Sequence, residues 1–437
     1  NYNLYSPRIV SQCVMAARIL LEDEEKIVIE VTISKNSNFL EFEERLQGGL
    51  SEAGRQVTER ALADFDADGS AFLVGGTKFT AKRKRVAKKY ETPFGTVQVE
   101  RFAYQTSGGG RTHIPLEVNA RIIGNATPRL AKLVSSKYSH GNAGIVQEDL
   151  RETLHREVSR CFIQDLSALV AGSIETKSPR WGNAGEEPSP AEVATVAIGL
   201  DGTSLLFCDE GYRQAMVGTI SFYDAAGERL HTHYVAAAPE HGRKTFLGDM
   251  DTEIARVRQA NPGARYVGIS DGAPDFRPWL ERHTTTRILD FWHLAEHLGG
   301  VAAALFAMAS QREAWMEDRC HRLKHEHGAA KRILKEIDDI RALGAHPSEA
   351  VETLDSFSGY LRANLDRTHY ASYRRSHLPI GSGVTEAACK TVVKQRMRGS
   401  GMKWKQSGAA TVLRLRAKRL TKGAWEAFWN RVGLVGL

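Results

Sequence analysis

Residues 194–292 carry the pattern of apolar side chains that most constrains the fold of this chain. Three strand-like runs follow one another with short connections, TVAIGLDGTSLLF, QAMVGTISFYD and ERLHTHYVAAA. A helical segment (RKTFLGDMDTEIARVRQ) comes next, then a buried strand (ARYVGISDG), a short helix and a last strand (TTRILDFWH). The sequence therefore predicts three meandering strands, a helix, a strand, a helix and a strand in a mixed α/β core.

This order of elements is that of a ribonuclease-H-like sheet, in which the first and fourth strands are neighbours. Asp201 follows the apolar run of the first strand and Asp271 that of the fourth, each just before a glycine. Glu386 lies in the first turn of a helix predicted over 382–397. A single acid in such a place is usually a loop or capping residue. Three acids at these positions are instead expected to converge at one point.

The chemistry of clustered acids explains why three would be needed. Neighbouring carboxylates raise each other's pKa unless cations neutralise them. Mg²⁺ or Mn²⁺ prefers such oxygen ligands and keeps positions open for water and phosphate. Two ions about 4 Å apart can serve an in-line phosphoryl displacement. Lys390 and Lys394 follow Glu386 at helical spacing, which predicts phosphate contacts, although a simple salt pair on a helix gives the same spacing.

Basic residues are concentrated in two segments of a chain whose formal net charge is only +7. Between Lys78 and Lys89 there are seven basic residues and no acidic one, and residues 382–437 contain twelve basic and two acidic residues. Such concentration indicates a polyanion binder, with a solvated helix face as the alternative. Tryptophans among the C-terminal cations favour nucleic acid. The predicted DNA contacts are Lys82, Arg83, Lys84, Arg85, Lys88, Lys89, Arg160, Lys390, Lys394, Arg396, Arg398, Lys403 and Trp404.

The rest of the chain suggests several further regions. Residues 38–66 are predicted to be helical, VAKKYETPFGTVQVERFAYQ a β-hairpin, and 127–174 three helical pieces, the last capped by Ser159. A helix-turn-helix and an ordinary three-helix bundle explain those pieces equally well. The predicted division is a helical region with a candidate role in dimerisation (1–77), a DNA-binding region (78–176), a linker (177–191), the first part of the core (192–292), a helical insertion (293–380) and a C-terminal helix with a basic tail (381–437).

Cysteine usage and hydropathy limit the kind of protein. The five cysteines are far apart and form no CxxC pair, which favours reduced thiols in a cytoplasmic protein over a disulfide framework. The most apolar stretch, Val301 to Ala309, is about half as long as a bilayer requires. We therefore expect no membrane span.

The chain resembles the DDE transposases of bacterial insertion sequences, in particular the ISKra group, and more distantly the Mutator-like transposases. The resemblance rests on GLDGTSLL, SDGAPDFRPWL, DFWHLAEHL and GSGVTEAACKTVVKQRMRGSGMKW, and on the YETPFGTVQVERFAY and TPRLAKLVSSKYSHGNAG stretches. It implies a ribonuclease-H-like core interrupted by helices, with Asp201, Asp271 and Glu386 as a triad for two Mg²⁺ or Mn²⁺ ions. It also implies DNA strand cleavage and transfer, a homodimer on double-stranded transposon ends and target, and a nucleoid-associated bacterial location.

Two residues near the predicted insertion are carried over only as auxiliary ones. Asp290-x-x-His293 matches the (C/D)xxH element of the Mutator-like relatives. Trp315 is a candidate for stacking on an unpaired base, although a buried core tryptophan is the more common interpretation.

Alternative functions stay open on the sequence alone. His293-Leu294-Ala295-Glu296-His297 fits the H-x-x-E-H pattern of inverted zinc peptidases. A transposase-derived protein that binds DNA without cutting it is the other alternative. Cys320, His321, His325 and His327 lack the spacing of a closed zinc site, so no structural zinc is predicted.

Overall fold

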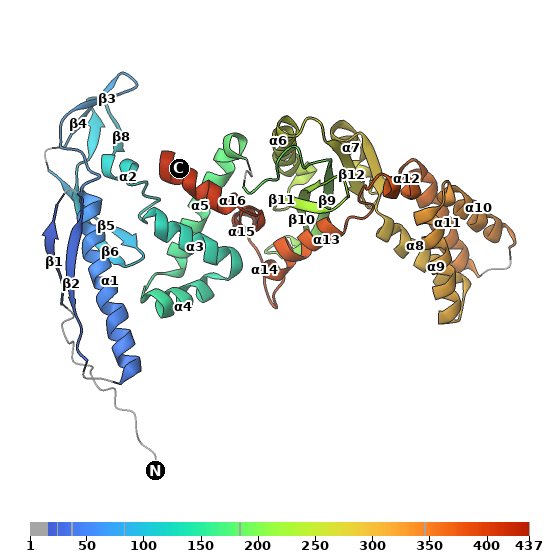
Figure 1. The fold of residues 1–437 in the computed structure, drawn as a ribbon, viewed down its shortest axis with the longest axis horizontal. Coiled ribbons are helices and arrows are strands. Elements are labelled where there is room, and N and C mark those ends of the chain that lie inside the picture. Colours follow the sequence, from blue (N-terminus) through green and yellow to red (C-terminus); the bar gives the residue numbers. More distant parts are fainter. Residues whose placement is uncertain are drawn as a thin grey trace, which may run out of the picture. The chain divides into compact units, whose positions relative to one another are not determined.

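The computed structural model describes residues 16–23, 25–35, 38–82, 84–182, 185–344 and 347–436 (Figure 1). The chain divides into two compact units, Asn1–Val170 with Trp429–Leu437, and Ala171–Phe428. Within the described ranges, no helix combines the length and the hydropathy that crossing a bilayer requires. The four cysteines within these ranges are all free, while Cys13 lies outside them.

The second unit is built on a five-stranded mixed sheet, so the predicted α/β class is confirmed. Its strands lie in the order β11-β10-β9-β12-β13. Strand β10 is antiparallel to both β9 and β11, and β12 is parallel to both β9 and β13. The strands are β9 (Thr195–Phe207), β10 (Gly211–Tyr223), β11 (Arg229–Ala237), β12 (Arg265–Ser270) and β13 (Thr286–Leu289).

The alternating side chains of β9 divide the core between the two faces of the sheet. Val196, Ile198 and Leu200 pack with Met250 of α6 in one buried cluster, whereas Ala197 belongs to a second cluster. This period of two is what the sequence of β9 predicts for a strand covered on both faces. The helices that connect the strands are η1 (His241–Arg243), α6 (Lys244–Ala260), η2 (Pro274–Phe276) and α7 (Arg277–His283).

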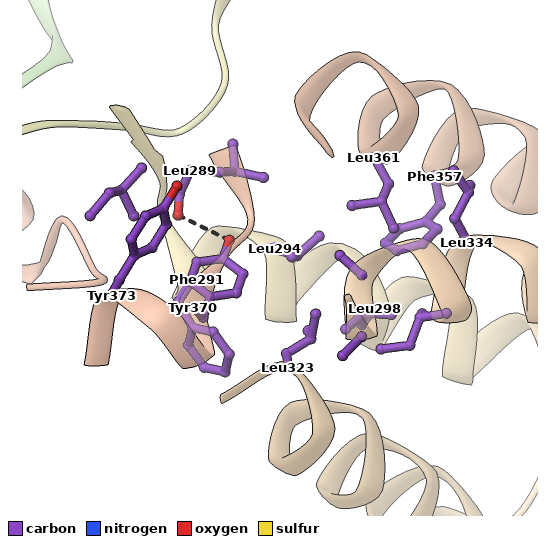
Figure 2. Packing of buried hydrophobic residues seen from close by; sticks show 14 of the residues in the cluster. Leu289, Phe291, Leu294, Leu298, Leu323, Leu334, Phe357, Leu361, Tyr370 and Tyr373 are labelled. Atoms are coloured by element: carbon purple, nitrogen blue, oxygen red, sulfur yellow. Dashed lines mark hydrogen bonds between the residues drawn. The ribbon is translucent and has the colours of Figure 1, made fainter. Parts of the chain in front are cut away.

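The predicted helical insertion is present and begins two residues earlier than expected, because Asp290 caps its first helix by accepting a hydrogen bond from the Trp292 amide. We call residues 291–375 the helical region. Figure 2 shows its core, where the Tyr370 hydroxyl donates to the Leu289 carbonyl at 3.0 Å. Its elements are α8 (Phe291–Leu305), α9 (Ala309–His325), α10 (Ala329–Ala342), α11 (Ser348–Asn364), η3 (Leu365–Arg367) and α12 (Tyr370–Arg375).

The last part of the second unit is helical and contains one irregular turn. The helix predicted over 382–397 is present in three pieces, the middle one of which is a π-helix. Buried Arg416 donates to the Thr391 and Val392 carbonyls of this turn. The pieces and the helices after them are α13 (Gly383–Ala388), η4 (Cys389–Lys394), α14 (Gln395–Met397), α15 (Gln406–Leu420) and α16 (Ala424–Val435), whose last residues belong to the first unit.

The first unit corrects one prediction, because the described part of 1–77 is not purely helical. Strands precede and follow its long helix, and the β-branched alternation of IVIEVT at 27–32 was the signal for one of them. The predicted hairpin is present as β5 and β6. The strands are β1 (Ala16–Glu22), β2 (Ile27–Thr32), β3 (Phe72–Val74), β4 (Thr77–Ala81), β5 (Val86–Thr92), β6 (Gly95–Arg101), β7 (Tyr104–Thr106) and β8 (Gly109–His113).

The helices of the first unit begin close to the predicted residues, but the predicted linker starts too early. Ser159 caps α5 by accepting from the Phe162 amide at 3.1 Å, as predicted. The same helix continues through Lys177 to Trp181, where the Trp181 ring packs 5.6 Å from that of Phe428. These helices are α1 (Phe39–Ala63), α2 (Pro115–Asn119), α3 (Pro128–His140), α4 (Ala143–Leu154) and α5 (Arg160–Trp181), whose residues from Ala171 on belong to the second unit.

Candidate functional site

Asp201 lies in the middle of β9, because the strand continues to Phe207 after the apolar run that precedes the acid. Its Oδ1 accepts a hydrogen bond from the Gly202 amide at 2.6 Å, and its Oδ2 accepts one from the Cys389 thiol at 3.3 Å. Burial, followed by the charge of Asp201 and this hydrogen bond, raises the pKa of the Cys389 thiol. The thiol therefore stays protonated at neutral pH and remains a donor to Asp201.

Glu386 is brought toward Asp201 by the packing of α13 on the sheet. The Thr385 and Thr219 hydroxyls are hydrogen-bonded at 2.7 Å, which fixes α13 on β10. Gly199 of β9 permits this approach, because a Cβ at that position would lie 2.1 Å from Thr385 Oγ1. Glu386 is exposed, and its Oε1 accepts a hydrogen bond from the Ser382 hydroxyl at 2.8 Å.

An open groove of about 960 Å³ lies over these residues, and we call it the carboxylate groove. Asp201 and Glu386 both line it, together with the exposed cations that helical spacing predicted for this face. It combines acidic oxygens with basic side chains. The lining residues are Asp201, Gly383, Glu386, Ala387, Cys389, Lys390, Lys394, Gln395 and Arg398.

Asp271 does not line this groove, although strand register relates it to Asp201. The parallel pairing of β12 with β9 ends at Ile269 opposite Gly199. Asp271 directly follows Ser270, the last residue of β12, whereas Asp201 lies within β9, two positions after Gly199. Asp271 is exposed, its Oδ1 accepts from the Ala273 amide at 2.9 Å, and its carbonyl accepts from the Tyr360 hydroxyl at 2.8 Å.

Tyr360 of α11 therefore links the helical region to the end of β12. Burial, followed by the charges of Asp271 and Asp290, raises the pKa of the Tyr360 hydroxyl. It remains a neutral donor at physiological pH. Nothing in the sequence around Tyr360 indicated this contact, because it joins residues that are far apart in the chain.

The carboxylates suit a divalent cation in chemistry but are not gathered around one point. Over the ranges that the structure describes, no three His, Cys, Asp or Glu side chains are grouped so that they could hold a metal ion. Asp201 and Glu386 supply the hard oxygen donors that Mg²⁺ prefers. Both oxygens of Asp201 already accept hydrogen bonds, from the Gly202 amide and the Cys389 thiol, and Glu386 Oε1 accepts one from Ser382. A carboxylate oxygen has a second lone pair, so these donors reduce the positions open to an ion without closing them.

The cations predicted to contact DNA fall into different environments. In the second unit Lys390, Lys394, Arg398 and Lys403 are exposed. Arg396 is only 5% exposed, with its guanidinium 5.3 Å from the centre of the Trp404 ring. The prediction that Arg396 contacts phosphate is therefore wrong for this conformation. Its position two residues after Lys394 places it on another face of the helix, which the sequence could have shown.

Trp404 and Trp315 both have structural contacts. Trp404 is half-buried, donates from Nε1 to the Met397 carbonyl at 2.9 Å, and pairs through its backbone with the end of β9. Trp315 is 8% exposed in the core of the helical region, with Arg319 4.5 Å above its ring. In this conformation the Trp315 ring is not available to a base, and the core interpretation is the correct one.

The basic candidates of the first unit form an exposed set of their own. Arg85 lies 4.5 Å from the centre of the Phe102 ring, and Arg160 donates to Gln147 at 3.3 Å. Arg83 lies outside the described residues. The exposed side chains are Lys82, Lys84, Arg85, Lys88, Lys89 and Arg160.

A second hollow, of about 540 Å³, lies between α8 and α11, and we call it the α8–α11 pocket. His293 and Glu296 line it with an Nδ1 to Oε2 distance of 3.5 Å, and the His297 ring stacks on Tyr360 at 4.2 Å. Its lining residues are His293, Glu296, His297, Gly300, Glu349, Glu352, Thr353, Ser356 and Phe357. His293 thus lies on this pocket, whereas Asp290 is buried at the start of α8.

The other residues considered as zinc ligands, Cys320, His321, His325 and His327, each contact different parts of the protein. The His321 and His325 rings are 4.5 Å apart, and His325 Nε2 lies 3.0 Å from Arg374. His327 Nδ1 lies 3.3 Å from the Ser372 hydroxyl. Cys320 packs against the hydrophobic core of the helical region.

Comparison with models of known protein families and with curated proteins found no match to this chain.

Proposed function

We propose that this chain is a DDE transposase that cuts and joins DNA strands through a ribonuclease-H-like core. The observation that carries the proposal is the carboxylate groove, in which Asp201 and Glu386 lie beside Lys390, Lys394 and Arg398. Phosphodiester chemistry requires acidic ligands near the reacting phosphate and cations along the neighbouring backbone. The sheet order of the second unit, with β9 next to β12, agrees with this assignment.

Asp201, Asp271 and Glu386 would hold Mg²⁺ or Mn²⁺ in this account. Two such ions, when bound, supply activation of the attacking oxygen and stabilisation of the leaving oxygen. In support, β9, which carries Asp201, pairs with β12, which Asp271 directly follows, and the Thr385–Thr219 hydrogen bond holds α13, which carries Glu386, on the sheet. In this proposal Cys389 and Ser382 keep their contacts with Asp201 and Glu386, and the ion would take the remaining lone pairs of the two carboxylates.

The proposed reaction has two phosphoryl transfers. In the first, a water oxygen attacks a phosphodiester at the end of the element, and the bond to the 3′ oxygen breaks to leave a 3′-hydroxyl. In the second, this hydroxyl attacks a phosphodiester of the target, so that one P–O bond forms as another breaks. Lys390, Lys394 and Arg398 would hold the phosphates of the strand beside the groove.

Double-stranded DNA is the proposed partner, and two copies of the chain would bring two ends together. In the first unit, contacts outside the groove would come from Lys82, Lys84, Arg85, Lys88, Lys89 and Arg160. Lys403 adds a cation in the second unit. Contacts of this kind fix the position on the duplex and depend strongly on salt.

A nicking assay tests the proposal directly. Supercoiled plasmid carrying the terminal sequences of the element is incubated with the full chain in Mg²⁺ or Mn²⁺. Asp201→Asn is expected to abolish nicking while DNA binding is retained, because the change removes a charged ligand without changing side-chain size. Asp209→Asn, at an exposed turn residue after β9, is the matched control and should nick normally.

The outcomes separate the proposal from its alternatives. Normal nicking by Asp201→Asn would refute the assignment of the groove. DNA binding by the unaltered chain without any nicking, in either metal, would favour the non-catalytic DNA-binding protein instead.

A further inference from the structure

Asp290 is a buried carboxylate that connects three segments of the second unit. It is 1% exposed, and its backbone amide donates to the Ser270 carbonyl, immediately before Asp271, at 2.8 Å. Its Oδ1 accepts from the Trp292 amide at 2.9 Å, which caps α8. Its Oδ2 accepts from the Ser382 hydroxyl at 2.5 Å. The end of β12, the start of α8 and the turn before α13 are therefore joined at one side chain.

Ser382 is shared between this buried acid and the exposed acid of the groove. Its Oγ lies 2.5 Å from Asp290 Oδ2 and 2.8 Å from Glu386 Oε1. A serine hydroxyl has one proton, so it can donate to only one of the two carboxylates at a time. The turn that carries Ser382 is itself held by the Phe291 amide, which donates to the Ile380 carbonyl at 2.9 Å.

The backbone around Ser382 leaves little freedom for this arrangement to shift. A Cβ on Gly381 would lie 2.7 Å from the Trp292 ring, so the turn passes directly against the first residues of α8. Glu386 follows Ser382 by one helical turn, and its amide donates to the Ser382 carbonyl at 3.0 Å. Ser382 thus has a fixed backbone and a side chain that reaches a long, otherwise exposed glutamate.

We propose that Ser382 is a positioning residue that orders the Glu386 carboxylate for divalent cation binding and couples it to the helical region through Asp290. This inference rests on the proposed function. The hydroxyl contacts Oε1, so Oε2 is the oxygen that would take the ion. Carboxylate ligands that are held by a hydrogen bond bind their ion more tightly, and loss of such a partner typically costs about 10- to 100-fold in affinity or activity.

The test measures Mn²⁺ binding to the full chain without DNA, by the paramagnetic resonance signal of the free ion. Ser382→Ala is expected to weaken binding about tenfold or more, and Ser382→Thr, which keeps the hydroxyl, should largely restore it. Ser310→Ala, on exposed α9 surface, is the matched control. Thermal unfolding of each variant checks that the protein remains folded.

The Mg²⁺ dependence of nicking supplies a second measurement. With Ser382→Ala, half-maximal nicking should require a higher Mg²⁺ concentration, and saturating Mg²⁺ should recover most of the rate. A merely structural role would lower the rate equally at every concentration.

Each outcome has a distinct meaning. If Glu386→Gln weakens Mn²⁺ binding and Ser382→Ala does not, the role of Ser382 is overturned while the proposed function stands. Tighter Mn²⁺ binding by Ser382→Ala would also overturn it, because Ser382 would then restrain Glu386. If neither Asp201→Asn nor Glu386→Gln changes Mn²⁺ binding, the proposed function fails, and the role of Ser382 fails with it.

Discussion

The carboxylate groove and the α8–α11 pocket are both open hollows of the second unit, but their charges differ in kind. The groove places Asp201 and Glu386 beside three exposed cations, Lys390, Lys394 and Arg398. The pocket combines His293 and His297 with Glu296, Glu349 and Glu352. A phosphate backbone is attracted by the first and repelled by the second. The charges of the lining residues, more than the volume, therefore distinguish the carboxylate groove, which is proposed to bind DNA, from the α8–α11 pocket.

The largest expected effect is on the stability of the helical region, at Trp315. Because its ring is buried among apolar side chains, Trp315→Ala should lower the free energy of unfolding by about 3–5 kcal/mol. Chemical denaturation monitored by circular dichroism measures this loss. Trp315→Phe is the milder control. A stable Trp315→Ala protein that has lost nicking would instead support base stacking and give the helical region a direct part in handling DNA.

The next effect concerns the cations of the groove. Replacing Lys390 and Lys394 by alanine should weaken DNA binding and reduce the slope of log K against log salt by about 1.8, or about 0.9 for each lost phosphate contact. Fluorescence anisotropy at several salt concentrations measures both quantities. Glu349→Gln with Glu352→Gln, in the α8–α11 pocket, is the matched pair and should leave the slope unchanged. A change in slope for the pocket pair alone would indicate that DNA lies near the α8–α11 pocket and not in the carboxylate groove.

Tyr360 joins the helical region to the end of β12, and its loss should have a smaller effect. Tyr360→Phe removes the hydrogen bond to the Asp271 carbonyl and should cost about 1 kcal/mol of stability. Thermal unfolding measures this cost, with Tyr212→Phe at an exposed position of β10 as the control. An unchanged midpoint in Tyr360→Phe would show that α11 does not support the end of β12.

The smallest effect is the pH dependence of the pocket. Burial, followed by the nearby His293, lowers the pKa of His297 from its ordinary value near 6.5, while Glu296 raises it. The fold therefore favours neutral His297, which also stacks on Tyr360. Its contribution to stability is complete above pH 6.5 and decreases as the pH falls toward the lower pKa of the folded state.

Unfolding measured from pH 7.5 to 5 tests this sign. His297→Gln should flatten the fall in stability below pH 6.5, whereas His241→Gln, at the turn before α6, should not. A steeper fall in His297→Gln would contradict the assignment of a half-buried imidazole that the fold favours in its neutral form.

The sequence predicted the elements that local pattern determines. The strands and helices of the second unit follow from apolar periodicity, and the Ser159 cap and the β5–β6 hairpin from residue preferences at helix starts and turns. The shared face of Glu386, Lys390 and Lys394 follows from helical spacing. These features depend on residues near each other in the chain, so one sequence is sufficient to predict them.

Other features depend on contacts between distant residues. The bridge from Asp290 through Ser382 to Glu386 spans 92 positions between the first two residues, and the thiol contact from Cys389 to Asp201 spans 188. Counting charges in the sequence also overestimated the number of exposed cations near the groove, because it grouped buried Arg396 with its exposed neighbours. The IVIEVT strand was missed although its alternation is clear in the sequence.

The most direct test of the account is to find where a divalent ion binds. Fe²⁺ replaces Mg²⁺ in the full chain, and ascorbate with peroxide then generates hydroxyl radicals that cut the polypeptide next to the ion. Cuts are expected near residues 201, 271 and 386, and both excess Mg²⁺ and the Asp201→Asn change should prevent them. Cuts confined to 293–297, or an unchanged pattern in Asp201→Asn, would contradict the proposed function.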